Sequence, residues 1–266
     1  MYIWIKRSRA LQKKWLAAAC ATAFTWSLIP AQASAQEPGE TIDRWTGDVE
    51  LAYLVKRGNT RSDTVNARSQ AERDFADWRH QARLDAANAE QRNNTTGDME
   101  RSAERYFGSY KIDLKLDGAN YLFNLVEAEK DRFTGYDYEA SYALGIGRRM
   151  FDNSLHRLDL EAGPGYRQRR LEEQPAEGRR TEEDALLRLG LRYLLNLSEN
   201  AQFRQETSTE IEDDATLTRA ATSVTSKLNS RLSLRVTHTL RHNSDPAPTA
   251  RSKTDQEVTV GIVYGF

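Results

Sequence analysis

The last residues of the chain alternate strictly between apolar side chains and small or polar ones. A strand repeats every two residues, so one face of this segment carries Val258, Val260, Ile262, Tyr264 and Phe266. A soluble protein would need a core to cover that face, whereas lipid would cover it directly. A last strand with alternating apolar residues and an aromatic end is typical of outer-membrane barrels. We therefore predict that it is the C-terminal assembly strand of a β-barrel.

The same alternation recurs along the rest of the chain. Six further segments place their large apolar residues on one face: 45–55, 106–114, 138–146, 158–166, 187–195 and 232–240. Short turn sequences at 74–77, 117–120, 151–154, 198–200 and 228–230 alternate with mostly longer polar stretches at 91–98, 131–136, 172–181, 212–215 and 243–252. Gly58-Asn59 is a two-residue hairpin signal on the long-loop side. The pattern predicts an all-β fold, a transmembrane up-and-down antiparallel β-barrel of about 12 strands.

Two regions fit this pattern poorly. The segment at about 60–74 offers only small outward residues, and the segment at about 201–228 would place Gln205, Thr207 and Thr209 outward. Three explanations are open for these regions: a wrong phase, a position above the membrane, or contact with a partner.

A soluble β-sandwich would also show alternating strands. The mean hydropathy of −0.73 and the 29% of charged residues are even typical of soluble chains. Barrels share such values, however, because only alternate residues face lipid. The tyrosines favour the barrel, since they lie on the apolar faces, mostly near strand ends, where an aromatic girdle would place them. These are Tyr53, Tyr106, Tyr110, Tyr138, Tyr142, Tyr166, Tyr193 and Tyr264.

The N-terminus has the three parts of a secretory signal. Five basic residues in 1–15 precede an uncharged, mostly apolar run over 16–30, and small residues end at Ala35. We predict a signal peptide at 1–35, cleaved near Ala35, then a short periplasmic segment at 36–43 and the barrel at 44–266. A transmembrane helix is the alternative, but the uncharged run is shorter than the roughly 20 residues that a bilayer requires. Lipidation of Cys20 is disfavoured because the apolar run before it is too short.

Removal of that segment changes the charge and the available chemistry. The mature chain would keep 33 of the 38 Lys and Arg residues against 39 Asp and Glu, a net charge near −6, which argues against a nucleic-acid partner. It would also lack cysteine, and with it any disulfide framework, thiolate metal site or cysteine nucleophile. His80, His156 and His238 are too scattered to form a ligand cluster, so we expect no metal site and no cofactor.

Several short motifs resemble a known family. They are Gly58-Asn59-Thr60, the segment 131–138 (DRFTGYDY), the segment 163–167 (GPGYR), and Asp255 before the final strand. Together they resemble the YdiY-like family of salt-induced outer-membrane proteins, whose domain has no known function, over about 45–266. The resemblance implies an outer-membrane barrel in a Gram-negative envelope, and the family's label hints at an osmotic-stress role. It supplies no catalytic residue.

The face opposite the apolar one carries charges of both signs and would line the lumen. We expect a ladder of Asp48, Glu50, Lys111, Asp113, Arg157, Asp159, Glu161, Arg167, Arg188, Arg192, Arg231 and Arg235. Neighbouring strands should place Asp159 and Glu161 across from Arg188 and Arg192. The ladder could form a constriction that selects ions or small solutes, or ion pairs that fill the barrel and hold its shape. Because the signs are balanced, we favour the ion pairs.

Inward glycines cluster in three consecutive strands, at Gly145, Gly147, Gly163, Gly165 and Gly190. They indicate sharp bending of the wall, or else a loop folded into the lumen. Basic pairs at Arg179-Arg180 and at Arg251 with Lys253 could contact lipopolysaccharide phosphates, or could be ordinary solvated loop residues.

One pair of residues suggests an enzymatic alternative. His242 and Ser244 have the spacing of a lipid-deacylase pair, and Glu257 lies in the following strand, where a carboxylate could orient the imidazole. Ser244 is more simply a turn residue before Asp245-Pro246.

The sequence thus predicts an integral, non-enzymatic outer-membrane barrel, porin-like, with a role as a narrow pore for ions or small solutes or as an osmotic-stress envelope component. The alternatives are a lipid-modifying hydrolase and a purely structural or adhesion barrel. Expected partners are outer-membrane lipid and lipopolysaccharide, the secretion translocon and the barrel-assembly machinery.

Overall fold

The computed structural model describes residues 44–56, 62–92, 96, 98–132, 134–172, 180–246 and 252–266. These residues form twelve strands: β1 (Thr46–Lys56), β2 (Ser62–Asp74), β3 (Trp78–Arg92), β4 (Met99–Lys115), β5 (Asn120–Asp131), β6 (Tyr136–Asp152), β7 (His156–Leu171), β8 (Thr181–Asn196), β9 (Ala201–Ile211), β10 (Thr216–Lys227), β11 (Leu232–Asn243) and β12 (Thr254–Gly265). The predicted signal peptide, the 36–43 segment and the Gly58-Asn59 turn lie outside the described residues. No helix long and apolar enough to cross a membrane occurs in the described part.

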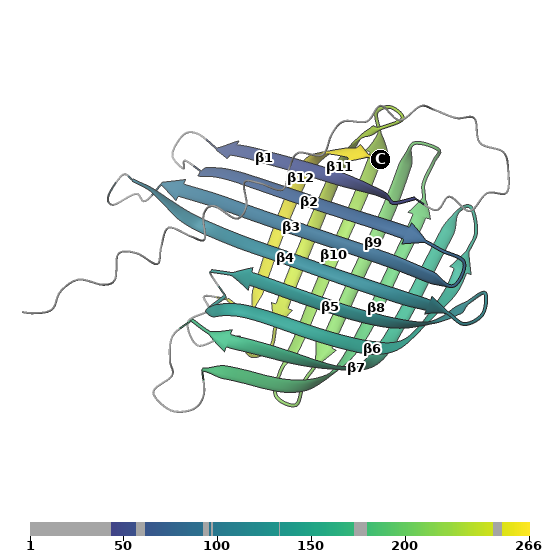
Figure 1. Ribbon diagram of the computed structural model, residues 1–266. Coiled ribbons are helices and arrows are strands. Elements are labelled where there is room, and N and C mark those ends of the chain that lie inside the picture. The colour runs from purple at the N-terminus through teal and green to yellow at the C-terminus, as the bar shows by residue number, and fades with distance from the viewer. Residues whose placement is uncertain are drawn as a thin grey trace, which may run out of the picture. The chain divides into compact units, whose positions relative to one another are not determined.

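Each strand pairs antiparallel with its neighbours in the sequence, and β1 pairs with β12, so the sheet closes into a barrel (Figure 1). The prediction of an up-and-down barrel of about twelve strands is confirmed. Each wall strand thereby pairs with a neighbour on both sides, although the β1–β12 ladder is short and the β3–β4 and β6–β7 ladders contain register shifts. Closure is what a membrane-spanning sheet requires, because hydrocarbon offers no hydrogen bonds to a free edge.

The outer surface carries the apolar set that the alternation predicted. Side chains of the last strand, including Val258, Val260 and Ile262, are well exposed, while Val263, the next residue, is buried in the interior. The same outward exposure holds for Leu51 of β1, Leu84 of β3, Ile146 of β6 and Leu189 of β8. Apolar side chains left exposed around a closed barrel are explained by lipid contact. The fold is therefore a transmembrane β-barrel.

Both poorly fitting regions are regular parts of the wall. β2 pairs over its whole length with β3, and β9 pairs with β10 over eleven residues. Gln205 and Thr209 do face outward, as phased, and they form hydrogen bonds along the outer surface. The Thr222 hydroxyl donates to Gln205 Oε1 at 2.5 Å, and the Thr209 and Thr218 hydroxyls lie 3.3 Å apart. A wrong phase is excluded, and the polar groups of this outer stripe satisfy one another.

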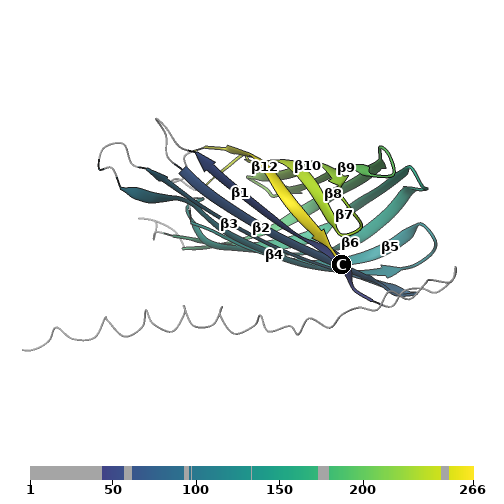
Figure 2. The same cartoon turned by 90° about the horizontal axis from the view of Figure 1, so that it is seen from above.

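The seam between the first and last strands is the shortest ladder in the described barrel. Residues 48–51 of β1 pair with 262–265 of β12, and two backbone hydrogen bonds join Gly47 to Phe266. By contrast, β12 pairs with β11 over eleven residues. β1 and β12 lie side by side next to the C-terminus in Figure 2. The rest of β12 therefore depends on β11 alone for its backbone partners.

The short turns use one recurring device. The side chain of Asp117 accepts hydrogen bonds from the backbone N–H groups of Ala119 and Asn120, at 3.2 and 2.7 Å. Asn153 and Asn229 make the equivalent pair of bonds in their own turns. Hydrogen bonds from Asn120 and Ala119 hold the pKa of Asp117 below its usual range. Such turns lie at the barrel end that also holds the start of β1 and the end of β12.

The inward glycines mark a sharply curved wall lined by aromatic side chains. A Cβ at Gly163 would lie 2.5 Å from the Cα of Gly145, so the backbones of β6 and β7 approach closely on the inner side. A Cβ at Gly145 would lie 2.7 Å from Phe123, and one at Gly147 would overlap the ring of Tyr121. These glycines therefore permit a close approach of β7 and of the β5 side chains. The space beside these glycines is filled by side chains of β5, not by the loop that the alternative reading proposed.

Together with neighbours, these side chains form the aromatic patch, defined as Tyr121, Phe123, Leu125 and Ala143. Phe123 is completely buried, and the other three are at most 5% exposed. A barrel interior with a small dry core of this kind resembles a soluble protein locally, and it explains why β5 is apolar on both faces.

Candidate pore lumen

A single large cavity of about 870 Å³ runs inside the barrel. It reaches Thr46 and Arg157 near the short-turn end and Asp131 and Asp255 near the long-loop end. Of the described strands, all but β6 contribute to its lining. β6 is screened because Tyr121 and Phe123 of β5 lie over its glycines. The cavity is therefore displaced away from β6.

Charges of both signs line the cavity in equal number among the described residues. The basic side chains are Arg68, Arg79, Arg83, Arg105, Lys111, Arg157, Arg188, Arg192, Arg204, Arg219 and Arg241. The acidic ones are Asp48, Glu72, Asp85, Glu127, Glu129, Asp131, Asp159, Glu161, Glu206, Asp255 and Glu257. The lumen as a whole thus has no strong net charge, and any selectivity has to come from local groupings.

Ten of the twelve predicted ladder residues are inward-facing strand residues. They are Asp48, Glu50, Lys111, Asp113, Asp159, Glu161, Arg167, Arg188, Arg192 and Arg235. Arg157 lies at the short-turn rim, where it pairs with exposed Asp152 at 3.1 Å. The prediction for Arg231 is wrong, because this residue is exposed in the turn before β11 rather than in a strand. Arg231 has the same alternation as the inward residues Ser233 and Arg235, but β11 begins one residue later, at Leu232.

The predicted pairing between β7 and β8 is correct in register and wrong in partners. Asp159 lies opposite Arg192, and Glu161 lies opposite Gly190, one step from both arginines. Their side chains turn elsewhere. Asp159 binds Arg149 of β6 at 2.9 Å, while Glu161 pairs with Lys111 of β4 and accepts a hydrogen bond from Tyr121 at 2.8 Å. Long side chains in a narrow lumen reach past their lateral neighbours, so register alone does not determine ion pairs.

Many of these ion pairs cross the lumen. Arg83 of β3 lies 3.6 Å from Glu206 of β9, six strands away around the ring, and Arg204 of β9 donates to Gln70 of β2 at 3.2 Å. Further contacts span from β5 to β8 and β10, and from β6 to β11. They are Arg188 with Glu127 at 2.9 Å, Arg219 with Glu129 at 3.0 Å, and Arg241 with Glu139 at 2.6 Å. These contacts connect opposite walls across the lumen.

The densest network lies near the long-loop end and is almost dry. Arg167 contacts both Glu210 and Glu212, and all three side chains are nearly inaccessible. Arg169 adds contacts to Glu212 at 3.0 Å and to Asp184 at 2.7 Å. Burial raises the pKa of Glu212, in the turn after β9, above its usual range, although Arg167 and Arg169 act in the opposite direction. These ion pairs join β7, β8 and the end of β9 on the inner side of the wall.

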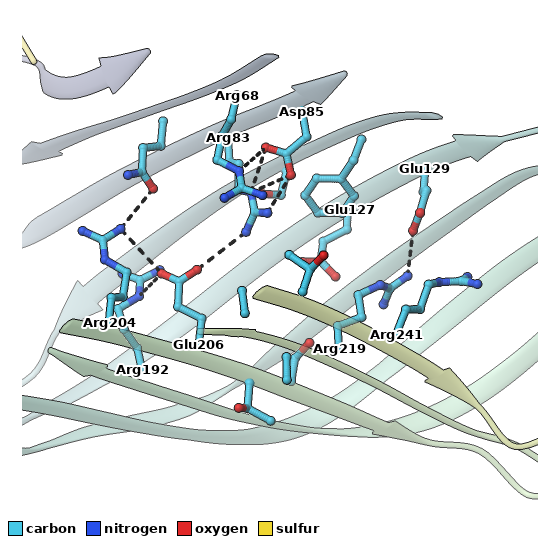
Figure 3. Close-up of a pocket in the computed structure, with 18 of the residues that line it drawn as sticks. Arg68, Arg83, Asp85, Glu127, Glu129, Arg192, Arg204, Glu206, Arg219 and Arg241 are labelled. Atoms are coloured by element: carbon cyan, nitrogen blue, oxygen red, sulfur yellow. Dashed lines mark hydrogen bonds and ion pairs between the residues drawn. The ribbon is translucent and has the colours of Figure 1, made fainter. Parts of the chain in front are cut away.

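A different grouping lies beside the open cavity, and we call it the arginine cluster: Arg68, Arg83, Arg192 and Arg204, with Asp85 and Glu206 (Figure 3). Asp85 is bound tightly, by Arg83 at 2.6 Å and Arg68 at 3.1 Å. The shortest distances to Glu206 are longer: 3.3 Å from Arg192, 3.6 Å from Arg83 and 3.8 Å from Arg204. Within these six side chains, four are basic and two are acidic. Further carboxylates lie around them: Glu72 and Glu161 near Arg192, and Glu127 near Arg83.

Several lumen residues were not predicted from the sequence. The aromatic patch was not recognised, nor were Arg79, Glu127, Glu129, Arg149, Arg169, Glu210, Glu212 and Arg219 as members of the network. A signal for the patch was present, because residues 121–126 are apolar on both faces and precede a strand with two inward glycines. Glu127, Glu129, Glu210 and Arg219 lie in β5, β9 and β10, whose weak outward faces gave no alternation to phase. Arg149 and Arg169 lie beyond the ends of the alternating segments 138–146 and 158–166, and Arg79 lies in β3, which was not among those segments.

The His242, Ser244 and Glu257 side chains do not form a catalytic group. His242 contacts the Thr254 hydroxyl at 2.7 Å on the outer face, and Ser244 Oγ accepts a hydrogen bond from the backbone N–H of Thr216 at 2.8 Å. Glu257 lies on the lumen side, where it accepts from Asn66. The geometry that motivated the hydrolase alternative is therefore absent from these three residues.

Two of the basic loop residues have local structural partners. Arg180 donates to the backbone carbonyls of Leu171 and Glu172, each at 2.8 Å, and Lys253 donates to the carbonyl of Ser244 at 2.7 Å. Arg179 and Arg251 lie outside the described residues. Within the described ranges, no group of three or more His, Cys, Asp and Glu side chains is arranged to hold a metal ion.

A closed antiparallel barrel with an apolar outer surface and a charged interior defines the class of transmembrane β-barrels. The sequence matches the family described as "Protein of unknown function, DUF481" over residues 49–266, and the chain belongs to that family. It is 27% identical over 249 residues to "Uncharacterized protein YdiY" of Escherichia coli (strain K12), covering 93% of this chain and 91% of that protein. The resemblance inferred from the motifs is confirmed.

Solved barrels of several kinds are distantly similar. The NanC porin shares 9% identity at a TM-score of 0.46, covering 82% of this chain and 98% of the porin. The COG4313 outer membrane channel of Pseudomonas putida F1 shares 10% at 0.46, covering 87% and 100%. The translocator domain of the autotransporter NalP of Neisseria meningitidis shares 13% at 0.44, covering 84% and 88%. With every one of these TM-scores under 0.5, the interpretation rests on the barrel's own geometry.

Proposed function

We propose that this protein is a narrow pore for small hydrophilic solutes in the outer membrane of a Gram-negative envelope. The observation that carries the proposal is the cavity of about 870 Å³, which extends from one barrel end to the other and is lined by polar and charged side chains. Its volume lies within the range of small-molecule sites, about 300–1,000 Å³. Paired charges let water and small polar solutes pass while the contacts across the lumen exclude larger ones.

The proposal also includes export of the chain and its insertion into the outer membrane. The basic, apolar and small-residue sections of 1–35 direct the chain through the secretion translocon, and cleavage follows near Ala35. The last strand, with its exposed apolar face ending in Phe266, serves as the assembly strand that the barrel-assembly machinery receives. Short turns then lie in the periplasm and longer loops face outward, where lipopolysaccharide surrounds them.

The test is electrical. Mature protein purified in detergent and added to planar bilayers should give discrete conductance steps, and Arg192→Ala should raise the step size because it shortens a cavity-lining side chain. Arg157→Ala at the wide, exposed rim is the matched control and should leave conductance nearly unchanged. Absence of conductance, together with absence of sugar flux into vesicles, would contradict the pore.

A closed structural barrel is the second candidate, and the ion pairs across the lumen favour it. Contacts such as Arg241 with Glu139 and Arg219 with Glu129 tie opposite walls together. In that case the folded protein would be fully inserted and yet electrically silent in every salt. Folded state, measured by circular dichroism and resistance to SDS, separates this outcome from simple misfolding.

A further inference from the structure

The arginines of the lumen belong to two kinds of environment. Arg167, Arg188 and Arg235 are nearly inaccessible, and each contacts two carboxylates at short range. Arg83, Arg192 and Arg204 keep 29%, 35% and 28% of their side-chain surface accessible, and this surface lines the cavity. The first kind is neutralised within the wall, whereas the second kind remains available to a solute.

The arginine cluster also has more hydrogen-bond donors than its carboxylates can accept. Each guanidinium offers about five N–H donors and each carboxylate about four acceptor sites, so roughly twenty donors face roughly eight carboxylate acceptor sites. Gln70 Oε1 accepts one further hydrogen bond, from Arg204. The three arginines nearest to Glu206 lie at 3.3–3.8 Å from it, beyond the roughly 2.7–2.9 Å of a charge-assisted hydrogen bond. Glu206 holds these side chains together without satisfying their donors.

The four arginines of the cluster come from opposite sides of the barrel. Arg68 and Arg83 come from β2 and β3, while Arg192 and Arg204 come from β8 and β9 on the far side of the ring. In Figure 3 the four converge around Asp85 and Glu206 from opposite walls. A solute that crosses the cavity at this level therefore meets guanidinium groups on two sides. Among the six side chains of the cluster, basic groups outnumber acidic ones by two.

We propose that the arginine cluster is a binding site for a small dianion with oxyanion groups, the chemistry shared by inorganic phosphate and short dicarboxylates. The planar guanidinium fork matches both phosphate and carboxylate geometry. A dianion supplies paired oxygen acceptors to the accessible guanidinium groups of Arg83, Arg192 and Arg204, whereas chloride supplies charge without the paired oxygens. This inference deepens the pore proposal and rests on it for the entry of the solute.

Glu206 has a specific role in this site. Its carboxylate occupies the place where a bound oxyanion would meet Arg83, Arg192 and Arg204. It therefore competes with the solute and keeps binding weak, which suits a pore that has to release what it binds. Substitution of Glu206 by glutamine should tighten binding, whereas a purely structural role predicts no gain.

Binding is measured first, without reference to conductance. Isothermal titration of the purified mature protein in an uncharged detergent, at low salt, compares inorganic phosphate, succinate and chloride. We expect phosphate or succinate to bind the wild type and chloride to bind at least about tenfold more weakly. Arg192→Gln with Arg204→Gln should weaken dianion binding by at least about tenfold, and Glu206→Gln should strengthen it about tenfold.

The matched control is Arg157→Gln, which removes a cavity-lining arginine outside the cluster and should bind as the wild type does. Circular dichroism and resistance to SDS establish that each variant is folded. Binding of phosphate alone, of succinate alone, or of both supports the site and identifies the solute. Binding of neither overturns it. Equal weakening in the Arg157 variant also overturns it, since the effect would then come from overall charge.

Conductance then separates this inference from the pore proposal. If phosphate or succinate binds and also reduces the chloride current of the wild type but not of the double variant, both proposals are supported. If the dianion binds and no current flows, the site is supported and the pore is wrong. If current flows and neither dianion binds, the pore is supported and the site is wrong.

Discussion

The aromatic patch and the arginine cluster occupy the same lumen and have opposite properties. In the patch, Phe123 and Tyr121 fill the room left by inward glycines of β6, and water is excluded. In the cluster, long side chains from opposite walls meet beside an open cavity. Two sectors of one barrel interior thus differ in packing and in polarity. One sector behaves as a small hydrophobic core that fixes the wall, and the other leaves polar groups available to solutes.

The largest expected change in stability is in the aromatic patch. Phe123→Ala should lower the free energy of unfolding by about 3–5 kcal/mol, because a fully buried ring is lost and a cavity remains. Denaturant unfolding in lipid vesicles, followed by tryptophan fluorescence, measures this. Phe107→Ala is the matched control: Phe107 lines the open cavity, under Arg83, and should cost about 1 kcal/mol. Similar losses for both would erase the distinction between the two sectors.

The next effect compares two arginines of β8. Arg188 is buried and contacts Glu127 and Glu210, so Arg188→Met should cost about 3 kcal/mol by leaving buried charge without its partner. Arg192 faces the cavity, so Arg192→Met should change stability by about 0.5 kcal/mol or less. Its effect should instead be on conductance. The same unfolding assay measures both, and a costly Arg192 variant would show that the cluster supports the wall.

The glycines of the curved wall give a smaller effect. Gly147→Ala should cost about 2 kcal/mol, because the added methyl overlaps the Tyr121 ring and displaces it from Glu161. In a Tyr121→Ala background the same change should cost almost nothing, and this coupling is the measurement. Gly190→Ala is the control, since its Cβ would lie 3.3 Å from Glu161 and needs only a slight shift. Additive effects of Gly147 and Tyr121 would contradict the packing described.

The smallest effect lies on the outer surface behind the arginine cluster. Thr209 and Thr218 pair with each other in an outer stripe that otherwise faces lipid. Replacing both by valine should stabilise the barrel by about 0.5 kcal/mol, because the hydroxyls are removed together and no partner is left unsatisfied. Unfolding in vesicles again gives the measurement. A loss above about 1 kcal/mol would indicate that a protein partner, and not hydrocarbon, covers the stripe.

The sequence was sufficient for the wall of the barrel and insufficient for its interior. Period-two alternation determines which side chains face lipid, so the outward set around Val258 and Ile262 could be phased from the sequence alone. Ion pairs across the lumen could not. Arg83 and Glu206 meet because the ring closes and brings β3 opposite β9, a relation that no local pattern encodes.

The aromatic patch is an intermediate case. Tyr121 and Phe123 alternate inward just before the strand that contains Gly145 and Gly147, and this order is visible in the sequence. Matching each ring to its glycine requires the register, which places Tyr121 beside Gly147 and Phe123 beside Gly145. For Arg231 the error lies in the strand boundary. The alternation assigned it to the inward face, but β11 begins at Leu232, so Arg231 lies in the preceding turn.

The short ladder between β1 and β12 has a consequence for how the barrel comes apart. Among the described residues, 254–260 of β12 have ladder partners in β11 alone, and the Asn66 side chain of β2 donates a hydrogen bond to Glu257 from the interior. Unzipping therefore begins at this edge, where the fewest rungs have to break, and the amides of β12 exchange with solvent before those of β6 or β7. A force that opens the barrel is therefore expected to separate β1 from β12 before any other pair of strands.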